Sequence, residues 1–306
     1  MMNRLLIAAV VLVLVLAMAA VGMACSSFVV YGANGAVFGM NFDIPAFDEA
    51  AESRFGFFEE SRNRVALIAR GDIKVFHYDQ NLFFTERGVF GCIHAAYPDL
   101  AMNRCEKRLV SWYDLYYWGT QFEKATDVVE FLENARLRHR RDADFHCLFA
   151  DGQGNALIVE PGVDVNEFHP MKGDYLVMTN FFLHILEGEF AAALAEAHPD
   201  VDLLAELDYD GRYRTAEAMI QASLDDFDYL RAFEVLEAVK QRITKVSVVV
   251  VPHELKVYFA LFQDFSRIWE VDLQAETIAT HSGFAEQRVE KIDAKGWTAF
   301  ELVEWK

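Results

Sequence analysis

Hydrophobic residues fill positions 5–24 without a single charge, directly after a basic residue. A basic start, a long apolar run and small residues at its end are typical of an export leader that is cut before Cys25. The run is also long enough to cross a bilayer, so an uncleaved anchor is the alternative. We predict a signal peptide at residues 1–24 and a mature domain at 25–306, exported to the periplasm or the extracellular space.

After the leader, apolar residues come in short runs bounded by turn residues, which predicts strands. The sequence Asn34-Gly35 separates SSFVVYG from AVFGMNFDI and predicts a β-hairpin. A second hairpin is predicted around 152–155, between FHCLFAD and ALIVEP. The C-terminal part returns to strands in KVSVVVVPHE, LKVYFALFQD and RIWEVDL.

Helical spacing of apolar residues is found in three regions. Residues 108–141 have it, with Thr126 or Asp127 as a helix N-cap, and further helices are expected at about 186–206 and 212–240. The predicted strands and helices do not alternate strictly along the chain, as they would in a doubly wound parallel sheet. This order favours an α+β fold with antiparallel sheets covered by helices. No repeat, low-complexity tract or linker divides the chain, so we expect one domain.

The charge of the chain limits its partners. The 306 residues carry a formal net charge of -19, which argues against nucleic acid or an anionic membrane surface as a partner. The 26 phenylalanines indicate a thick core and are compatible with an apolar substrate. We expect a small-molecule partner and no membrane contact after leader removal, and the pattern leaves the oligomeric state open.

The chain has four cysteines, at 25, 92, 105 and 147. In an oxidising compartment Cys92 and Cys105 could form a disulfide, or both could be buried free thiols. The sequence contains no C-x-x-C, no H-E-x-x-H and no clustered histidines. We therefore expect no metal site and no cofactor.

Cys25 lies at the junction of leader and first strand, where it is a lipid attachment point, a buried thiol or a nucleophile. As the first residue of a mature chain it would carry both a thiol and an α-amine with a pKa near 7.7–8.0, which supplies nucleophile and base together. Asp43, Asn180 and Arg212 could orient the amine, stabilise an oxyanion and anchor the site. Each of these three also has an ordinary explanation as a strand-end or helix-start residue.

Several segments resemble a known superfamily. The opening CSSFVVYGANGAVFGMNFDI is similar to that of the N-terminal-nucleophile hydrolases of the choloylglycine hydrolase and acyl-CoA:6-aminopenicillanic acid acyltransferase superfamily. TERGVFGCIHAA, FHCLFADGQGNALIVEP, VMTNFF, GRYR and the closing strands resemble further family segments in the same order, over most of residues 25–273. The resemblance implies a four-layer αββα sandwich of two antiparallel sheets flanked by helices, and cleavage of linear, non-peptide amide bonds in N-acyl small molecules.

The resemblance also implies roles for individual residues. Cys25 would be the nucleophile with its α-amine as base, Asp43 would hold that amine, and Asn180 would donate to the oxyanion. Arg212 would complete the site, with Arg214 as the alternative because the spacing is one residue short. The residues expected to contact or support the substrate are Asn41, Met40 and Phe181.

Met40 stands where the family usually has arginine in G-R-N-x-D. The loss removes a cation that would lower the thiol pKa. Three explanations are open: another cation replaces it, the substrate differs, or the protein is inactive. The segment TNFF is closer to the T-N-H-F of the acyltransferase-like branch than to the bile-salt branch.

Two other classes compete with an N-terminal nucleophile. A lipid-anchored envelope protein would carry its lipid on Cys25, but Gly22 and Met23 depart from the usual lipobox. A lipidated and acylated Cys25 would have neither a free thiol nor a free amine, so lipoprotein and enzyme exclude each other. A papain-like protease is disfavoured because C-G-S-C-W is missing, and we expect His146 to be structural.

Overall fold

Two eight-stranded sheets, in which every neighbouring pair of strands is antiparallel, form the centre of the described chain. The computed structural model describes residues 25–43, 64–78, 81–96, 107–137, 144–162, 165–187, 191–192, 196 and 202–305. The predicted leader and Cys105 lie outside these residues. Within the described part, no helix is long and apolar enough to cross a bilayer.

The first sheet joins the N-terminal hairpin to five strands of the C-terminal third, with one strand from the middle of the chain at its edge. Its order is β12 (Tyr175–Met178), β1 (Ser26–Gly32), β2 (Gly35–Asp43), β13 (Thr244–Val251), β14 (Lys256–Leu261), β15 (Ile268–Asp272), β16 (Thr277–Ser282) and β17 (Val289–Lys291). The second sheet has the order β11 (Asn166–Pro170), β10 (Ala156–Pro161), β9 (Asp144–Asp151), β6 (Val89–Ala96), β5 (Leu82–Thr85), β4 (Ile73–Tyr78), β3 (Arg64–Arg70) and β18 (Trp297–Thr298).

Both predicted hairpins are present. Gly35 has φ +101°, a backbone conformation that glycine adopts without a steric penalty, and it closes the turn between β1 and β2. In the turn between β9 and β10, the Asp151 carboxylate accepts hydrogen bonds from the backbone N–H groups of Gln153 and Asn155. The local turn chemistry therefore fixes the pairing of these strands.

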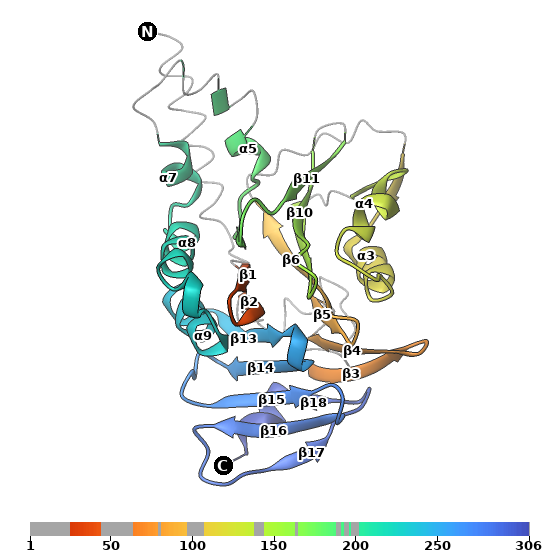
Figure 1. Ribbon diagram of the computed structural model, residues 1–306, viewed down its shortest axis with the longest axis vertical. Helices are drawn as coiled ribbons and strands as arrows, with labels where there is room; N and C mark the ends of the chain where they lie inside the picture. The colour runs from red at the N-terminus through yellow and green to blue at the C-terminus, as the bar shows by residue number, and fades with distance from the viewer. Residues whose placement is uncertain are drawn as a thin grey trace, which may run out of the picture.

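Helices cover the outer face of each sheet (Figure 1). On the first sheet lie α8 (Arg212–Ala222) and α9 (Tyr229–Ala238), and on the second lie α3 (Trp112–Gly119) and α4 (Asp127–Leu132). Shorter elements are β7 (Arg108–Val110), β8 (Ala135–Leu137), α5 (His184–Glu187), α7 (Leu203–Leu207), η1 (Leu224–Asp226), η2 (Pro252–Glu254) and α10 (Ala299–Val303).

Two of the predicted helices are wrong in extent. The helix expected over 212–240 is two helices, because Asp228 accepts hydrogen bonds from two backbone N–H groups and starts α9 as a new helix. The region 108–141 contains a short parallel strand pair at its ends as well as two helices, and Ser111 caps the first of these. Of the stretch 186–206, a large part lies outside the described residues, and α5 and α7 flank it.

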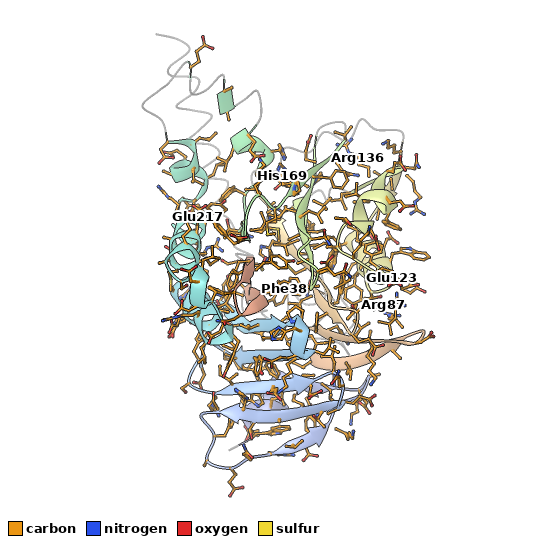
Figure 2. All side chains as sticks on the ribbon, viewed as in Figure 1. Phe38, Arg87, Glu123, Arg136, His169 and Glu217 are labelled. Carbon is orange, nitrogen blue, oxygen red and sulfur yellow. The ribbon has the colours of Figure 1, made fainter. Side chains whose placement is uncertain are left out.

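Three hydrophobic clusters separate the layers. Phe38 lies in the cluster between the two sheets (Figure 2). Phe28 and Phe233 belong to the cluster beneath α8 and α9, and Phe83 and Phe149 to that beneath α3 and α4. Each such buried side chain stabilises the fold by about 1.5–3 kcal/mol. The order of layers is helix, sheet, sheet, helix, which confirms the predicted αββα sandwich.

Two glycines with positive φ provide a matched test of this packing. At Gly283, φ is +79° and an added Cβ would overlap the carbonyl group of Ser266. At Gly173, φ is +104° and an added Cβ would have no heavy atom within 4 Å apart from its neighbours along the chain. We expect Gly173→Ala to lower the free energy of unfolding by about 1–2 kcal/mol, through backbone strain alone. Gly283→Ala should cost about 3 kcal/mol or more. Urea denaturation measures both, and equal costs would show that the strand β16 does not end against Ser266.

Candidate active site

Arg212 joins the segments that the sequence analysis assigns to the site. It is the first residue of α8 and its side chain is 5% exposed. One terminal nitrogen, Nη1, donates to the carbonyl oxygen of Cys25 at 2.7 Å and to Ser26 Oγ at 2.8 Å. The other, Nη2, donates to Asn180 Oδ1 at 2.9 Å, and Nε pairs with Asp210 at 2.6 Å. A single guanidinium thus ties the start of β1 to the end of β12.

The structure distinguishes between the two arginines considered for this position. Arg214 is 45% exposed and lies 3.5 Å from Asp202 and 3.6 Å from Asp208. Arg212, not Arg214, contacts Cys25.

Cys25 immediately precedes β1 and belongs to the cluster between the two sheets. Its side chain is fully buried in the chain that still carries residues 1–24. Burial raises the pKa of the thiol, and the nearby Asp43 carboxylate raises it further. A backbone N–H of Asp43 and the Arg212 guanidinium act in the opposite direction, but burial dominates. The thiol is therefore protonated at neutral pH.

Asp43, at the end of β2, offers one unused oxygen. The Thr244 hydroxyl donates to Oδ1 at 2.5 Å, while Oδ2 is buried and has no hydrogen-bond partner among the described residues. Burial raises the pKa of Asp43 to about 7, against the lowering effects of Thr244 and Arg212. A buried carboxyl group with a vacant acceptor is suited to hold an N–H group beside Cys25.

The raised pKa of Asp43 gives a pH-dependent prediction for a chain that keeps the residues before Cys25. Well below pH 4, the Asp43 carboxyl group is protonated in both the folded and the unfolded chain. Between about pH 4 and about pH 7 the unfolded chain loses this proton and the folded chain keeps it, so the wild type loses up to about 1.4 kcal/mol of stability per pH unit relative to Asp43→Asn. Above that range the difference is constant. Urea denaturation of both chains across this range measures it, and a difference independent of pH would contradict the shift.

Asn180 follows β12 and is held from both ends of its amide. Its oxygen accepts from Arg212, and Nδ2 donates to the carbonyl oxygen of Ala95 at 2.6 Å. These contacts fix the plane of the amide next to the segment that begins with Cys25. The orientation is that of a preorganised polar group rather than a solvated turn residue.

The three residues expected to contact or support the substrate lie in different surroundings. Met40 is buried in the cluster between the sheets, which also contains Cys25. The Asn41 side chain lies on the opposite face of β2 from Met40. Its Nδ2 donates to the carbonyl oxygen of Leu236 in α9, so it is on the helix-covered face of the strand. Phe181 is buried, with its ring centroid 5.3 Å from that of Tyr213.

A chain of buried polar groups beside the site was not predicted from the sequence. Ser27 Oγ lies 3.1 Å from His94 Nε2 and 3.5 Å from the buried free thiol of Cys92. His94 Nδ1 and His146 Nε2 both contact the carbonyl oxygen of Thr179, at 3.1 and 2.8 Å. Burial lowers the pKa of His94 well below its usual value, so this ring is neutral. These linked polar side chains hold the backbone at Thr179, directly before Asn180. No sequence motif indicates that they lie together.

Glu160, in β10, continues this chain on the far side of His146. Its Oε1 accepts from the backbone N–H of Leu183 at 2.8 Å and lies 3.3 Å from His146 Nδ1. Oε2 lies 2.8 Å from His184 Nδ1 and 3.2 Å from His169 Nε2. Burial alone would raise the pKa of Glu160, but hydrogen bonds with His146 and His184 and the nearby His169 ring hold it well below its usual range.

A cavity of about 320 Å³ opens beside His169, between β11, β12, α5 and α8. His169 and Glu217, labelled in Figure 2, line it from β11 and α8. The other lining residues are Phe168, Pro170, Lys172, Tyr175, Leu176, Val177, Leu183, Leu186, Glu187 and Tyr213. Cys25 is fully buried and does not line this cavity.

No protein-family model matches the chain, and no curated protein matches it in sequence. Two solved structures of conjugated bile acid hydrolase from Clostridium perfringens, an arginine-to-leucine variant and a cysteine-to-alanine mutant, are similar in fold. Both have a TM-score of 0.54 over 88% of this chain and 97% of that chain, at 14% and 15% identity. Penicillin V acylase from Agrobacterium tumefaciens has a TM-score of 0.50 over 81% of this chain and 91% of that chain, at 14% identity. The chain therefore has the fold of these proteins, with the four αββα layers that its sequence predicts.

Proposed function

We propose that the chain is an N-terminal-nucleophile hydrolase or acyltransferase that cleaves linear, non-peptide amide bonds of N-acyl small molecules. The observation that carries the proposal is the guanidinium of Arg212, which joins Cys25 and Asn180 at one point. The fold supports it, because the similar structures are named as a bile acid hydrolase and a penicillin V acylase.

We further propose that residues 1–24 direct export and are removed, so that Cys25 becomes the first residue. Cleavage would create an α-amine on the residue whose carbonyl Arg212 already holds. The buried Oδ2 of Asp43, which has no hydrogen-bond partner among the described residues, would accept from this amine.

The proposed reaction is acyl transfer through a thioester. The Cys25 sulfur attacks the amide carbonyl, and its proton passes through the α-amine to the leaving nitrogen as the C–N bond breaks. The amide group of Asn180 and backbone N–H groups would stabilise the oxyanion. Water or another amine then attacks the thioester, releases the acyl group and restores the thiol. Because the thiolate is the nucleophilic form of cysteine, the α-amine would take the thiol proton as the sulfur attacks.

The residue at position 40 favours a second candidate function. This candidate is an inactive protein of the same fold with a binding or structural role in the envelope. An apolar, buried side chain stands where relatives usually have a cation. Arg212 counters this, since its charge lowers the thiol pKa from another direction. A lipid anchor on Cys25 belongs to the same alternative.

A substrate panel tests the proposal against this alternative. The mature chain would be incubated with penicillin V, conjugated bile acids and N-acyl amino acids, and the released amine would be quantified. We expect turnover of at least one member by the wild type and none by Cys25→Ser. Turnover that is independent of Cys25, or absent throughout the panel, would favour the inactive protein.

A further inference from the structure

We propose that Glu160, His169 and His184 form a binding site for one divalent transition metal ion of the zinc class. The three residues come from β10, β11 and α5, at the end of the sandwich beside the cavity (Figures 1 and 2). One ligand atom from each lies within 4.8 Å of the other two. The inference does not depend on amide hydrolysis.

The distances between the ligand atoms fit such an ion. Bonds from zinc to nitrogen or oxygen are about 2.0–2.2 Å, so neighbouring ligand atoms of a tetrahedral site lie about 3.3 Å apart. Glu160 Oε2 is 3.2 Å from His169 Nε2 and 2.8 Å from His184 Nδ1. Small side-chain adjustments would therefore open the triangle to the size of a metal site.

His169 presents an unused nitrogen to this position. Its Nε2 is buried and forms no hydrogen bond among the described residues, although it lies close to the Glu160 carboxylate. The other ring nitrogen, Nδ1, lies 3.4 Å from Glu187 Oε2. Metal-binding histidines usually donate their second N–H to a carboxylate, which leaves a lone pair toward the ion. His169 has a carboxylate within reach of Nδ1, as this arrangement requires.

The carboxylate of Glu160 is oriented by groups other than the two histidine ligands. Backbone N–H groups of Leu183 and His184 donate to its two oxygens at 2.8 and 3.1 Å, and His146 Nδ1 lies 3.3 Å from Oε1. Such outer contacts fix the direction of a ligand before the ion arrives. The same backbone segment follows Asn180 by a few residues, so an ion here would also fix the end of the proposed active-site strand.

The donor set selects the class of ion. Calcium and magnesium prefer shells made of oxygen, whereas two imidazoles and one carboxylate suit zinc and its neighbours in the first transition row. His169 borders the cavity, so the fourth position would face open space and accept water or a small ligand.

Titration of the full chain with Zn²⁺ and Co²⁺ tests the site. A Cys25→Ser background, stripped with a chelator, removes the nucleophile thiol as a competing ligand. We expect one Zn²⁺ bound per chain by calorimetry, a visible absorption band of tetrahedral Co²⁺, and a higher unfolding temperature with Zn²⁺. His169→Gln and His184→Gln should each weaken Zn²⁺ binding at least 10-fold and abolish the rise in unfolding temperature.

Two further variants keep the test decisive. His253→Gln changes an exposed histidine on η2 and should bind Zn²⁺ like the parent. Glu187→Gln removes only the charge next to His169 Nδ1 at a half-exposed position, so it should fold normally and weaken binding several-fold. No bound Zn²⁺ in the parent, or equal affinity in the His169, His184 and His253 variants, would overturn the proposal.

Discussion

Replacing Cys25 with alanine is expected to lower kcat/KM for an N-acyl amide substrate by at least about 10⁴-fold, because the variant keeps the α-amine but has no nucleophile. Cys147→Ala is the matched control, since this thiol is also buried and free but lies in β9. It should retain activity within a few-fold. Amine release by both variants under saturating and subsaturating substrate gives the comparison.

The two cysteine variants also separate chemistry from folding. Both remove a buried sulfur, so each should lose a similar, small amount of stability, about 1 kcal/mol. If Cys25→Ala retained substantial turnover, or if both variants lost activity equally, the thiol at position 25 would not be the nucleophile.

Arg212→Ala is expected to lower both stability and activity. The change leaves Asp210 without its ion-pair partner and removes donors to the Cys25 carbonyl and to Asn180. Breaking a buried pair of this kind costs about 3–5 kcal/mol, and loss of the oriented amide should lower kcat at least about 10²-fold. Arg212→Lys should recover little, because one ammonium group cannot reproduce the fork of a guanidinium.

Arg214→Ala is the control for this prediction. Arg214 is 45% exposed and its two carboxylate contacts are long, so its loss should change stability by about 0.5 kcal/mol or less. Urea denaturation and kcat for the three variants measure the contrast. Equal effects at positions 212 and 214 would contradict the central position given to Arg212.

The sequence predicts the layered fold because its strongest signals are local. Asn34-Gly35 and the turn at 152–155 define hairpins whose strands the structure confirms, and the return to strands after residue 244 completes the first sheet. Helix boundaries are less well predicted. The break before α9 covers residues 223–228, where the 3₁₀ turn η1 and the Asp228 cap interrupt a spacing of apolar residues that otherwise resembles one helix.

The candidate site was only partly accessible from sequence, since its contacts join residues far apart along the chain. Motif order pointed to Arg212 and Asn180 but left Arg214 open, and only the folded chain shows which arginine contacts Cys25. Asn41 stands two positions before Asp43, yet its side chain bonds to α9 and not to the site. Side-chain direction and long-range contact decide both points.

The cluster around Glu160 was missed for the same reason. Its histidines at 169 and 184 follow at intervals that match no short metal motif, because each belongs to a different element. They converge only when β11 pairs with β10 and α5 turns back over the same edge.

The role of the Cys25 α-amine can be tested with two chains that differ by one residue: one begins at Cys25 and the other at Ala24, and the remaining sequence is identical. We expect amide cleavage by the first chain and loss of turnover in the second, whose thiol is intact but whose Cys25 nitrogen is part of a peptide bond. Equal turnover by both chains would contradict this role, because the base would then have to be some other group.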